Sequence, residues 1–304
     1  MSARSSRFSR PRGAALLLAL WALFVLSAMV ISWAMDIGAR LSLNGAASRV
    51  MEAEAMACSG SEIALHPGVK PSSPLLHGGV SRTQHFDARL TGEGGRLNIN
   101  WVVAGENPNR IDIVRAYLER KGIDLNEREH MIDCLLDWVD PDNLVRLNGA
   151  EDDGDYHPAN TLFARIDDLK RVRGWEVFTR QPDWDADLTV NSTGPIDLTW
   201  ASRDLLLSLP GMNDGRVDQF LTLRRGADEI DGTEDDPEFK SMDDVRVALG
   251  LSTEQFKELA PLVGFKDQVM RVVSVGKSGD VTRTVQMVIR KTGNIPQMIT
   301  WKEI

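Results

Sequence analysis

The longest apolar pattern is a run of 22 residues, 14–35, that contains no Asp, Glu, Lys, Arg or His. A helix of this length, rising about 1.5 Å per residue, would cross the roughly 30 Å hydrocarbon core of a bilayer. Four arginines and no acidic residue precede the run, at positions 4, 7, 10 and 12. Because positive charge ahead of an apolar segment stays on the cytoplasmic side, the pattern predicts a single-pass membrane anchor with its C-terminal body outside the cytoplasm.

Beyond this run, the pattern predicts that the helix continues to about residue 64 and is followed by a loop rich in Pro and Gly over residues 66–79. A first strand is expected at residues 83–90. Residues 97–103 alternate between apolar and polar side chains, which predicts a second strand with one buried face. The glycines within residues 92–95 predict a turn between the two strands.

From residue 107 the apolar spacing changes to three and four residues, which is typical of helices. Asn126 with Glu129, and Ser252 with Gln255, predict two capping boxes at helix starts. Further short helices are expected at residues 167–173, 202–209, 215–225, 242–249 and 253–263. The last forty residues return to β-branched segments, which predict strands at residues 269–275, 281–290 and 295–301.

This order of elements predicts an α+β fold in which a large all-helical domain is inserted between the strands of one small antiparallel sheet. Such an insertion is tolerated because a long loop costs little more closure entropy than a short one. The expected boundaries are 14–64 for the N-terminal helix, 65–104 with 264–304 for the sheet, and 105–263 for the insertion. Within the insertion, two helical subdomains are expected at about 105–180 and 190–263.

Composition and charge narrow the function. Apolar residues make up 42% of the chain and charged residues 26%, as in folded globular proteins. The formal net charge is −9, and removal of the first 13 residues with their four arginines would lower it to −13. Such a charge repels phosphate backbones and favours cations, so nucleic acid is not expected as a partner. Cys58 and Cys134 either form a disulfide or remain buried thiols, and we favour the thiols.

Three interpretations of the N-terminus compete. A cleavable secretory signal is disfavoured, because the apolar cores of such signals run to roughly 7–15 residues. A plain single-pass anchor fits the pattern. In the third interpretation the chain is cut after Gly13, so that Ala14 becomes the first mature residue. This layout resembles the type IV pilins and pseudopilins, and the resemblance implies a leader of residues 1–13, cleavage by a prepilin peptidase and methylation of Ala14.

The fifth mature position, Leu18, departs from the common pilin pattern. Most pilin-like subunits have Glu there, where it neutralises the terminal ammonium of a neighbouring subunit. A subunit without this carboxylate suits the end of an assembly, as in the K-type minor pseudopilins of the type II secretion system. Segments along the chain also resemble this family: residues 94–100 (GGRLNIN), 135–142 (LLDWVDPD), 148–152 (NGAED) and 207–212 (LSLPGM).

The resemblance implies a stem helix in the inner membrane, a pilin-like sheet with a helical insertion, and calcium in the helical domain. It also implies a non-enzymatic function at the tip of a periplasmic pseudopilus, assisting the export of folded proteins across the outer membrane. Its partners would be other minor pseudopilins, through stem and globular contacts, and the exported proteins. Two alternatives lie outside the family: an anchored periplasmic scaffold or binding protein with a calcium-stabilised helical domain, and an anchored hydrolase.

The densest candidate site is the acidic segment 137–155, in which Pro141 ends a predicted helix and glycines interrupt the carboxylates. Oxygen ligands on a flexible loop suit Ca²⁺, which takes six to eight of them. The spacing does not match the EF-hand formula, and a solvated acidic loop is the alternative. The expected ligands are Asp140, Asp142, Glu151, Asp152 and Asp155. A second acidic run, residues 228–236, gives the weaker candidates Asp231 and Asp235.

Other chemistry finds less support in the sequence. Residues 198–225 resemble a helix–hairpin–helix, but Asn213 stands where DNA-binding versions have a second turn glycine, so we expect a packing function. No cysteine–histidine cluster suggests zinc, and the five scattered histidines form no nucleophile–base set. Nor are paired carboxylates placed across an aromatic cleft, as in glycosidases. The sequence therefore does not predict an enzyme.

Overall fold

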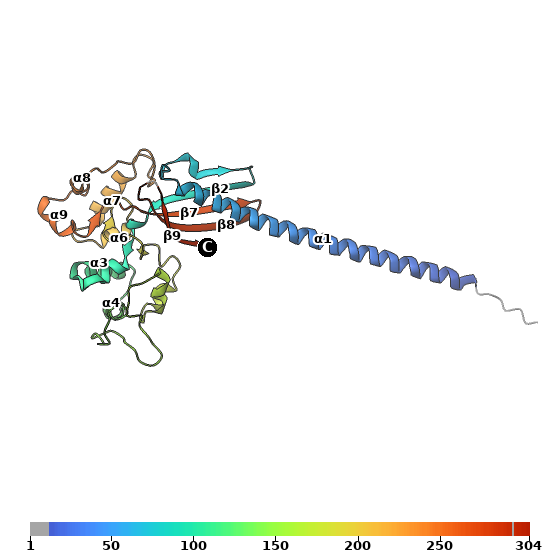
Figure 1. Ribbon diagram of the computed structural model, residues 1–304, viewed down its shortest axis with the longest axis horizontal. Coiled ribbons are helices and arrows are strands. Elements are labelled where there is room, and N and C mark those ends of the chain that lie inside the picture. The colour runs from blue at the N-terminus through green and yellow to red at the C-terminus, as the bar shows by residue number, and fades with distance from the viewer. Residues whose placement is uncertain (1–11, 294) are drawn as a thin grey trace, which may run out of the picture.

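The computed structural model of the protein describes residues 12–293 and 295–304. A long helix, α1 (Arg12–Leu65), leads into a body made of an antiparallel sheet and a large, mostly helical insertion, which confirms the predicted α+β fold (Figure 1). The helix is continuous over 54 residues, and its N-terminal part projects away from the body. Of the predicted leader, residues 1–11 lie outside the described residues.

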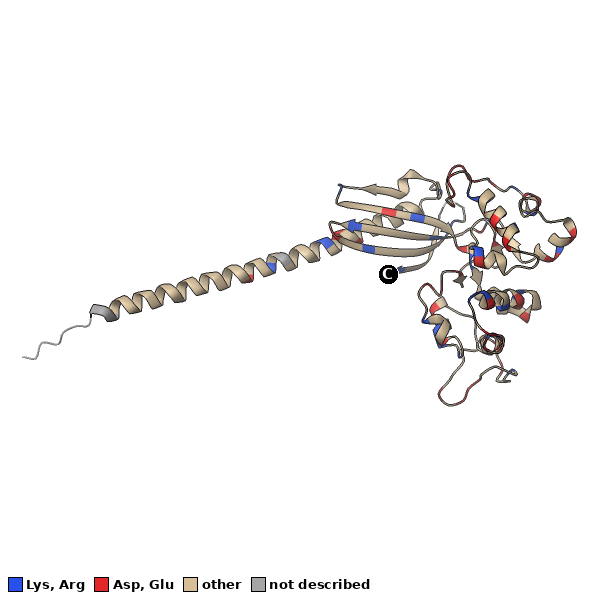
Figure 2. Ribbon diagram, turned by 180° about the vertical axis from the view of Figure 1, so that it is seen from behind, with Lys and Arg blue, Asp and Glu red and all other residues tan. Residues whose placement is uncertain are grey.

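The projecting part of α1 is apolar on all sides. From Leu16 to Met35, each large apolar side chain is at least half exposed, and Figure 2 shows no charged residue on this stretch. The first charged pair beyond it is Asp36 with Arg40, 2.9 Å apart on consecutive turns. Among the described residues, α1 is the one helix long and apolar enough to cross a bilayer.

The C-terminal part of α1 packs on the sheet through small side chains. Ala53, Ala57 and Ala64 are fully buried. A Cβ atom on Gly276 of the sheet would lie 2.1 Å from the carbonyl oxygen of Ala53, so this close approach of helix and sheet requires glycine. Among the described residues, this interface forms the smaller of two apolar cores.

The sheet has five antiparallel strands in the order β1-β2-β7-β8-β9. β2 and β7 are neighbours, and Gly92 near the end of one pairs with Met270 near the start of the other. The segment between them is therefore inserted between adjacent strands, as the sequence predicted. The strands predicted at residues 83–90, 269–275, 281–290 and 295–301 are confirmed with shifted ends, whereas β1 lies in the segment 66–79 that was expected to be a loop. The bounds are β1 (His77–Gly79), β2 (Gln84–Gly92), β7 (Val269–Ser278), β8 (Val281–Arg290) and β9 (Gln297–Glu303).

The strand predicted over residues 97–103 is wrong. The chain forms only a two-residue strand, β3 (Leu97–Asn98), and then turns into the short helix α2 (Ile99–Val103). The side chain of Asn98 caps this helix by accepting a hydrogen bond from the backbone N–H of Trp101, 3.1 Å away. The polar residue that completed an apparent alternation is thus a helix cap.

The first half of the insertion continues with α3 (Pro108–Arg120), α4 (Leu125–Asp137), η4 (Ile166–Arg171) and α5 (Glu176–Thr179). The predicted capping box of Asn126 and Glu129 is wrong, because Asp124 caps α4 by accepting from the backbone N–H of Asn126 at 2.9 Å. Glu129 instead pairs with Arg115 of α3, with 2.6 Å between Oε1 and Nε. Short 3-10 turns lie before α3 at η1 (Pro74–Leu76), η2 (Glu93–Gly95) and η3 (Ala104–Glu106).

The second half contains α6 (Arg203–Leu207), α7 (Asp214–Arg224), α8 (Met242–Ala248) and α9 (Thr253–Leu259). Ser252 and Gln255 form the predicted capping box at α9. The insertion also holds two small parallel pairs that the sequence analysis did not predict: β3 with β4 (Leu188–Thr189), and β5 (Ile196–Asp197) with β6 (Val263–Gly264). One apolar cluster runs through both halves, and the expected boundary between two subdomains stays a prediction.

A buried ion pair joins the insertion to the sheet. Glu93, at the start of the insertion, is fully buried and accepts two hydrogen bonds from Arg271 of β7, at 2.7 and 2.8 Å. The Thr189 hydroxyl donates to the same carboxylate. Because this bidentate pair is desolvated, it fixes where the chain leaves and re-enters the sheet.

Candidate cation site

Three carboxylates converge where α4 ends. Asp137 is the last residue of α4, Asp140 follows one turn later, and Glu151 returns from the loop beyond. One oxygen of each lies within 4.8 Å of the others. Asp137 and Glu151 are buried and Asp140 is half-buried. The backbone N–H of Asp140 still bonds to the carbonyl of Leu136, 3.1 Å away, so the helix end itself holds this carboxylate in place.

The loop 141–150 closes tightly over the helix end. A Cβ atom on Gly149 would lie 1.9 Å from Oδ2 of Asp137, so only glycine fits at this position. Arg146 places its guanidinium against both aspartates, with Nη1 in contact with Oδ1 of Asp137 and Oδ2 of Asp140. Its Nη2 reaches Oε1 of Glu106 at 2.7 Å.

Glu151 is the unusual member of the cluster. Its residue surface is only 5% exposed, yet neither of its carboxylate oxygens has a hydrogen-bond partner among the described residues. The same is true of Oδ1 of Asp140. Burial, and then the charges of Asp137, Asp140 and Asp142, raise the pKa of Glu151. A buried carboxylate without a donor is costly, and a hard divalent cation would supply the missing partner. The donor set therefore fits Ca²⁺.

Not all of the predicted ligands join this cluster. Asp140 and Glu151 do, whereas Asp142 accepts a hydrogen bond from the backbone N–H of Leu144 at 2.8 Å in a local turn. Asp152 lies 3.2 Å from the ring of His157. Asp155 is exposed and outside the group.

The sequence analysis left Asp137 out of the expected ligand set. The signal that could have found it is its spacing, because Asp137 and Asp140 lie three residues apart across a helix end and so meet on one side. The spacing does not reveal that Asp137 is buried. Asp137 is fully buried, like the neighbouring Trp138.

The second acidic run also brings three carboxylates together, at Asp228, Asp235 and Asp236. Asp235 was expected among the ligands, while Asp228 and Asp236 were not. Asp231 is not in the group, because its two oxygens bind Arg224 at 2.8 and 2.9 Å. The sequence thus identified the acidic run but not which of its carboxylates lie close together.

The predicted processing site lies at the start of α1. Gly13 and Ala14 are helical, and nothing in the described residues tests cleavage between them. Leu18 is 71% exposed on the projecting part. Cys58 and Cys134 are free thiols that belong to different parts of the fold, Cys58 beside the helix–sheet core and Cys134 inside the core of the insertion.

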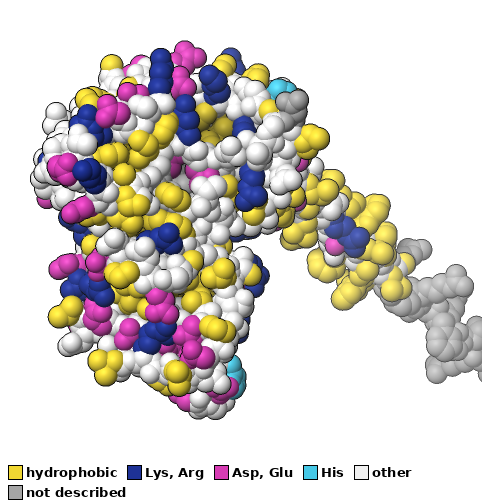
Figure 3. All heavy atoms as spheres, turned by 60° about the vertical axis from the view of Figure 1, so that its left-hand side comes forward, with side chains coloured by type: hydrophobic (Ala, Val, Ile, Leu, Met, Phe, Trp, Pro, Cys, Tyr) yellow, Lys and Arg dark blue, Asp and Glu magenta, His cyan; other side chains and the backbone are white. Residues whose placement is uncertain are grey.

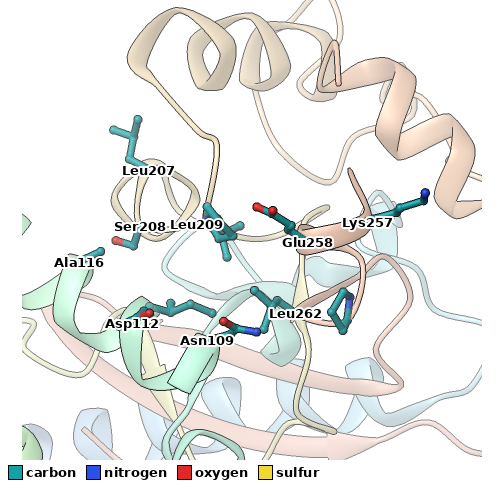
Figure 4. A pocket seen from close by; sticks show the side chains of 12 residues that line it. Asn109, Asp112, Ala116, Leu207, Ser208, Leu209, Lys257, Glu258 and Leu262 are labelled. Atoms are coloured by element: carbon teal, nitrogen blue, oxygen red, sulfur yellow. The ribbon is translucent and has the colours of Figure 1, made fainter. Parts of the chain in front are cut away.

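A cleft of about 590 Å³ lies between α3, α6 and the segment around α9 (Figure 4). Two charged residues of its lining are engaged in local pairs, Asp112 with Arg115 and Lys257 with Glu254. None of the described residues that line it is His or Cys. On the end of the body shown in Figure 3, acidic and basic side chains are interspersed with apolar ones.

The first half of the insertion is similar to a known protein family. Residues 95–181 match the family model for the first domain of protein K of the type II secretion system. A 71-residue stretch is 32% identical to the type II secretion system protein K of Dickeya chrysanthemi. The resemblance to the K-type minor pseudopilins is confirmed. The stretch covers 23% of this chain and spans only a fifth of the length of that relative.

A solved structure shares the fold of most of the chain. One chain in the crystal structure of the GspK-GspI-GspJ complex from the type 2 secretion system of enterotoxigenic Escherichia coli superposes with a TM-score of 0.60. The match covers 88% of this chain and 99% of the other, at 14% sequence identity. The K-type likeness in the insertion is therefore accompanied by a shared overall fold.

Proposed function

We propose that the protein is a minor pseudopilin of a type II secretion system and that its function is structural rather than enzymatic. The observation that carries the proposal is the placement of a protein K domain between adjacent strands β2 and β7 of a sheet on a stem helix. The stem would hold the chain in the inner membrane, and the acidic body would work in the periplasm. The arginines before the apolar run support this orientation.

The exposed part of α1 supports assembly with similar subunits. Its apolar side chains need to be covered, first by lipid and then by the stems of other minor pseudopilins. Leu18 offers no carboxylate to the terminal ammonium of a subunit above, so the protein would sit at the tip. The insertion, on the far side of the sheet from the projecting stem, would cap the fibre there (Figure 1). Exported proteins would meet this cap.

Calcium is the proposed structural ion, bound between Asp137, Asp140 and Glu151. The unpaired oxygens of Glu151 and Asp140 support this assignment, since they need a cationic partner. The ion would tie the end of α4 to the returning loop. The other predicted acids, Asp142, Asp152 and Asp155, would contribute through the local field or through water.

Mass spectrometry of the chain purified from inner membranes with an active prepilin peptidase tests the proposal. We expect a mature N-terminus at Ala14, carrying a methyl group. A chain that keeps Met1, or that is cut after residue 35, would support the anchored scaffold instead. Gly13→Leu should block cleavage, whereas the matched control Gly45→Leu, within the same helix, should leave it intact.

Tip placement has its own test, through cross-linking of stems in the membrane. With Leu18 in place we expect partner stems on one side only, because no subunit docks above. Leu18→Glu should allow cross-links on both sides. Leu17→Glu, which places the same charge one position earlier, is the control and should not. Cross-links on both sides of the unmodified chain would contradict tip placement.

A further inference from the structure

Arg146 contacts carboxylates from three segments of the protein. Its Nη1 touches Asp137, at the end of α4, and Asp140, in the following turn. Its Nη2 lies 2.7 Å from Glu106 of η3, before α3 begins. Its own backbone N–H also points to Oδ2 of Asp137, at 3.3 Å. One side chain therefore connects the helix end, the loop and the preceding element.

The guanidinium uses some oxygens of the cluster and leaves others free. It takes Oδ1 of Asp137 and Oδ2 of Asp140. Oδ1 of Asp140 and both oxygens of Glu151 are buried and have no partner among the described residues. Arg146 therefore binds both oxygens of Asp137, one of them through its backbone N–H, and one oxygen of Asp140. The oxygens without a partner, from Asp140 and Glu151, are the ones available to a metal ion.

The charges of the cluster point the same way. The three clustered carboxylates carry −3 and the guanidinium carries +1, which leaves −2. Glu106, the other partner of the guanidinium, is 54% exposed, so solvent screens its charge. A divalent cation neutralises the remaining charge of the cluster, whereas a trivalent one leaves an excess. Since uncompensated charge is expensive in a buried site, the guanidinium helps to select the charge of the ion.

We propose that Arg146 is a positioning residue of the cation site: it holds Asp137 through both oxygens and Asp140 through one, and it matches the remaining charge to a divalent ion. The inference rests on the calcium site proposed above. Arg146 would hydrogen-bond to the carboxylates that bind the metal and orient them without contacting the ion itself. The opposite function, competition of the guanidinium with the ion, would require the two to use the same oxygens.

The same residue anchors an exposed apolar segment. Its neighbours Leu144, Val145 and Leu147 are 76%, 60% and 96% exposed. Arg146 lies between these residues in the sequence, and its side chain contacts the carboxylates of the cluster. An ion that fixes the carboxylates would therefore also restrict the motion of the segment. Calcium should therefore slow backbone hydrogen exchange at residues 143–148.

Calorimetric titration of the full chain in detergent with CaCl₂ tests the inference. Arg146→Gln should weaken calcium binding roughly 10- to 100-fold, the usual effect of losing a residue that orients metal ligands. Arg173→Gln is the matched control, since it removes the same charge from a pair with Asp153 outside the cluster. It should leave the affinity equal or slightly higher. Arg146→Lys keeps the charge without the fork and should fall between.

Titration with LaCl₃ measures the preference of the site for a trivalent over a divalent ion. This preference should not change if Arg146 only stabilises the fold. Arg146→Gln raises the negative charge of the site, so the ratio of La³⁺ to Ca²⁺ affinity should rise in that variant and not in Arg173→Gln. Tighter calcium binding by Arg146→Gln than by Arg173→Gln would overturn the inference in favour of competition. An unmodified chain that binds no calcium would remove the site and the inference together, while N-terminal processing still tests the pseudopilin assignment.

Discussion

The two acidic loops of the insertion have similar composition but differ in whether their carboxylates accept hydrogen bonds from the protein. In the loop after α4, Glu151 and one oxygen of Asp140 are buried without partners. In the loop after α7, Asp231, Asp235 and Asp236 are supplied with donors by the chain itself. Asp235 accepts from the backbone N–H of Ala227, at 2.6 Å, and from the hydroxyl of Thr233, at 2.7 Å.

Asp231 and Asp236 complete the second loop in the same way. Asp231 binds the nearly buried Arg224 through both oxygens, and Asp236 accepts from the backbone N–H of Gly232, at 2.6 Å. The comparison teaches that carboxylate density alone does not make a metal site. What matters is whether buried oxygens are left without donors, and we therefore expect the loop after α4 to bind calcium more tightly.

The largest expected effect is on the second loop. Arg224→Ala removes a nearly buried guanidinium that also donates to the carbonyls of Leu198 and Ala201, at 3.0 and 2.8 Å. We expect the free energy of unfolding to fall by about 3–5 kcal/mol, with or without calcium, because Asp231 loses its partner. Urea denaturation of the full chain in detergent measures this loss. Arg225→Ala, at a more exposed pair with the same aspartate, is the control and should cost less than about 1 kcal/mol.

The next effect is on the first loop. With calcium at about 100 times its Kd, the unmodified chain should gain about 2.7 kcal/mol of stability. Glu151→Gln should abolish this gain. In chelator the same variant should be more stable than the unmodified chain by about 1 kcal/mol, because a buried charge without a donor is gone. Asp153→Asn, at an exposed ion pair of the same loop, should keep the calcium response. A full thermal shift with calcium in Glu151→Gln would contradict the account.

Glu151 and Asp235, one from each loop, should respond to pH in opposite directions. The pKa of Glu151 is raised above its ordinary 4.5 by burial and neighbouring carboxylates. Its contribution to stability in chelator is therefore present below pH 4.5 and lost as pH rises through the folded pKa. The pKa of Asp235 is lowered from 3.8 by the Thr233 hydroxyl and backbone N–H groups. Its contribution is present above pH 3.8 and lost as pH falls through the folded pKa.

Denaturation across this pH range in chelator measures both contributions. The difference between the unmodified chain and Glu151→Gln should grow as pH rises above 4.5. The difference between the unmodified chain and Asp235→Asn should instead grow as pH rises from below 3.8 and then stay level. Calcium affinity should rise over the range in which Glu151 loses its proton. Parallel curves for the two variants would mean that the loops do not differ in bonding.

The smallest expected effect concerns a predicted ligand that the structure places outside the cluster. Asp142→Asn keeps the acceptor for the N–H of Leu144 and removes only the charge. Calcium binding should weaken by less than about 1 kcal/mol, as for a nearby charge rather than a ligand. Calorimetric titration would detect a larger loss, which would make Asp142 a direct ligand and enlarge the site.

Long patterns were predictable from the sequence, and short ones were not. The apolar run of α1 and the β-branched strands β7 and β8 are specified by many residues each, so these elements follow from the pattern. Residues 97–103 are too few for that, and one hydrogen bond to Asn98 decides between strand and helix. The pairs β3–β4 and β5–β6 contain two residues per strand, and only tertiary packing creates them.

The candidate site shows the same division. The sequence located both acidic runs, and it named Asp140 and Glu151 as ligands. It could not reveal that Asp137 is buried against the loop, that Gly149 has no space for a side chain, or that Arg146 turns inward. These features depend on how the chain closes over the end of α4. The types of residue in the loop do not determine how the loop folds over this helix end.

Calcium binding by three full-length proteins tests the central claim most directly. Calorimetry on the unmodified chain, Glu151→Gln and Asp235→Asn compares the two loops by an equal change of charge. We predict that the tightest binding step is lost in Glu151→Gln and kept in Asp235→Asn. Loss of that step in Asp235→Asn, with Glu151→Gln unaffected, would contradict the account.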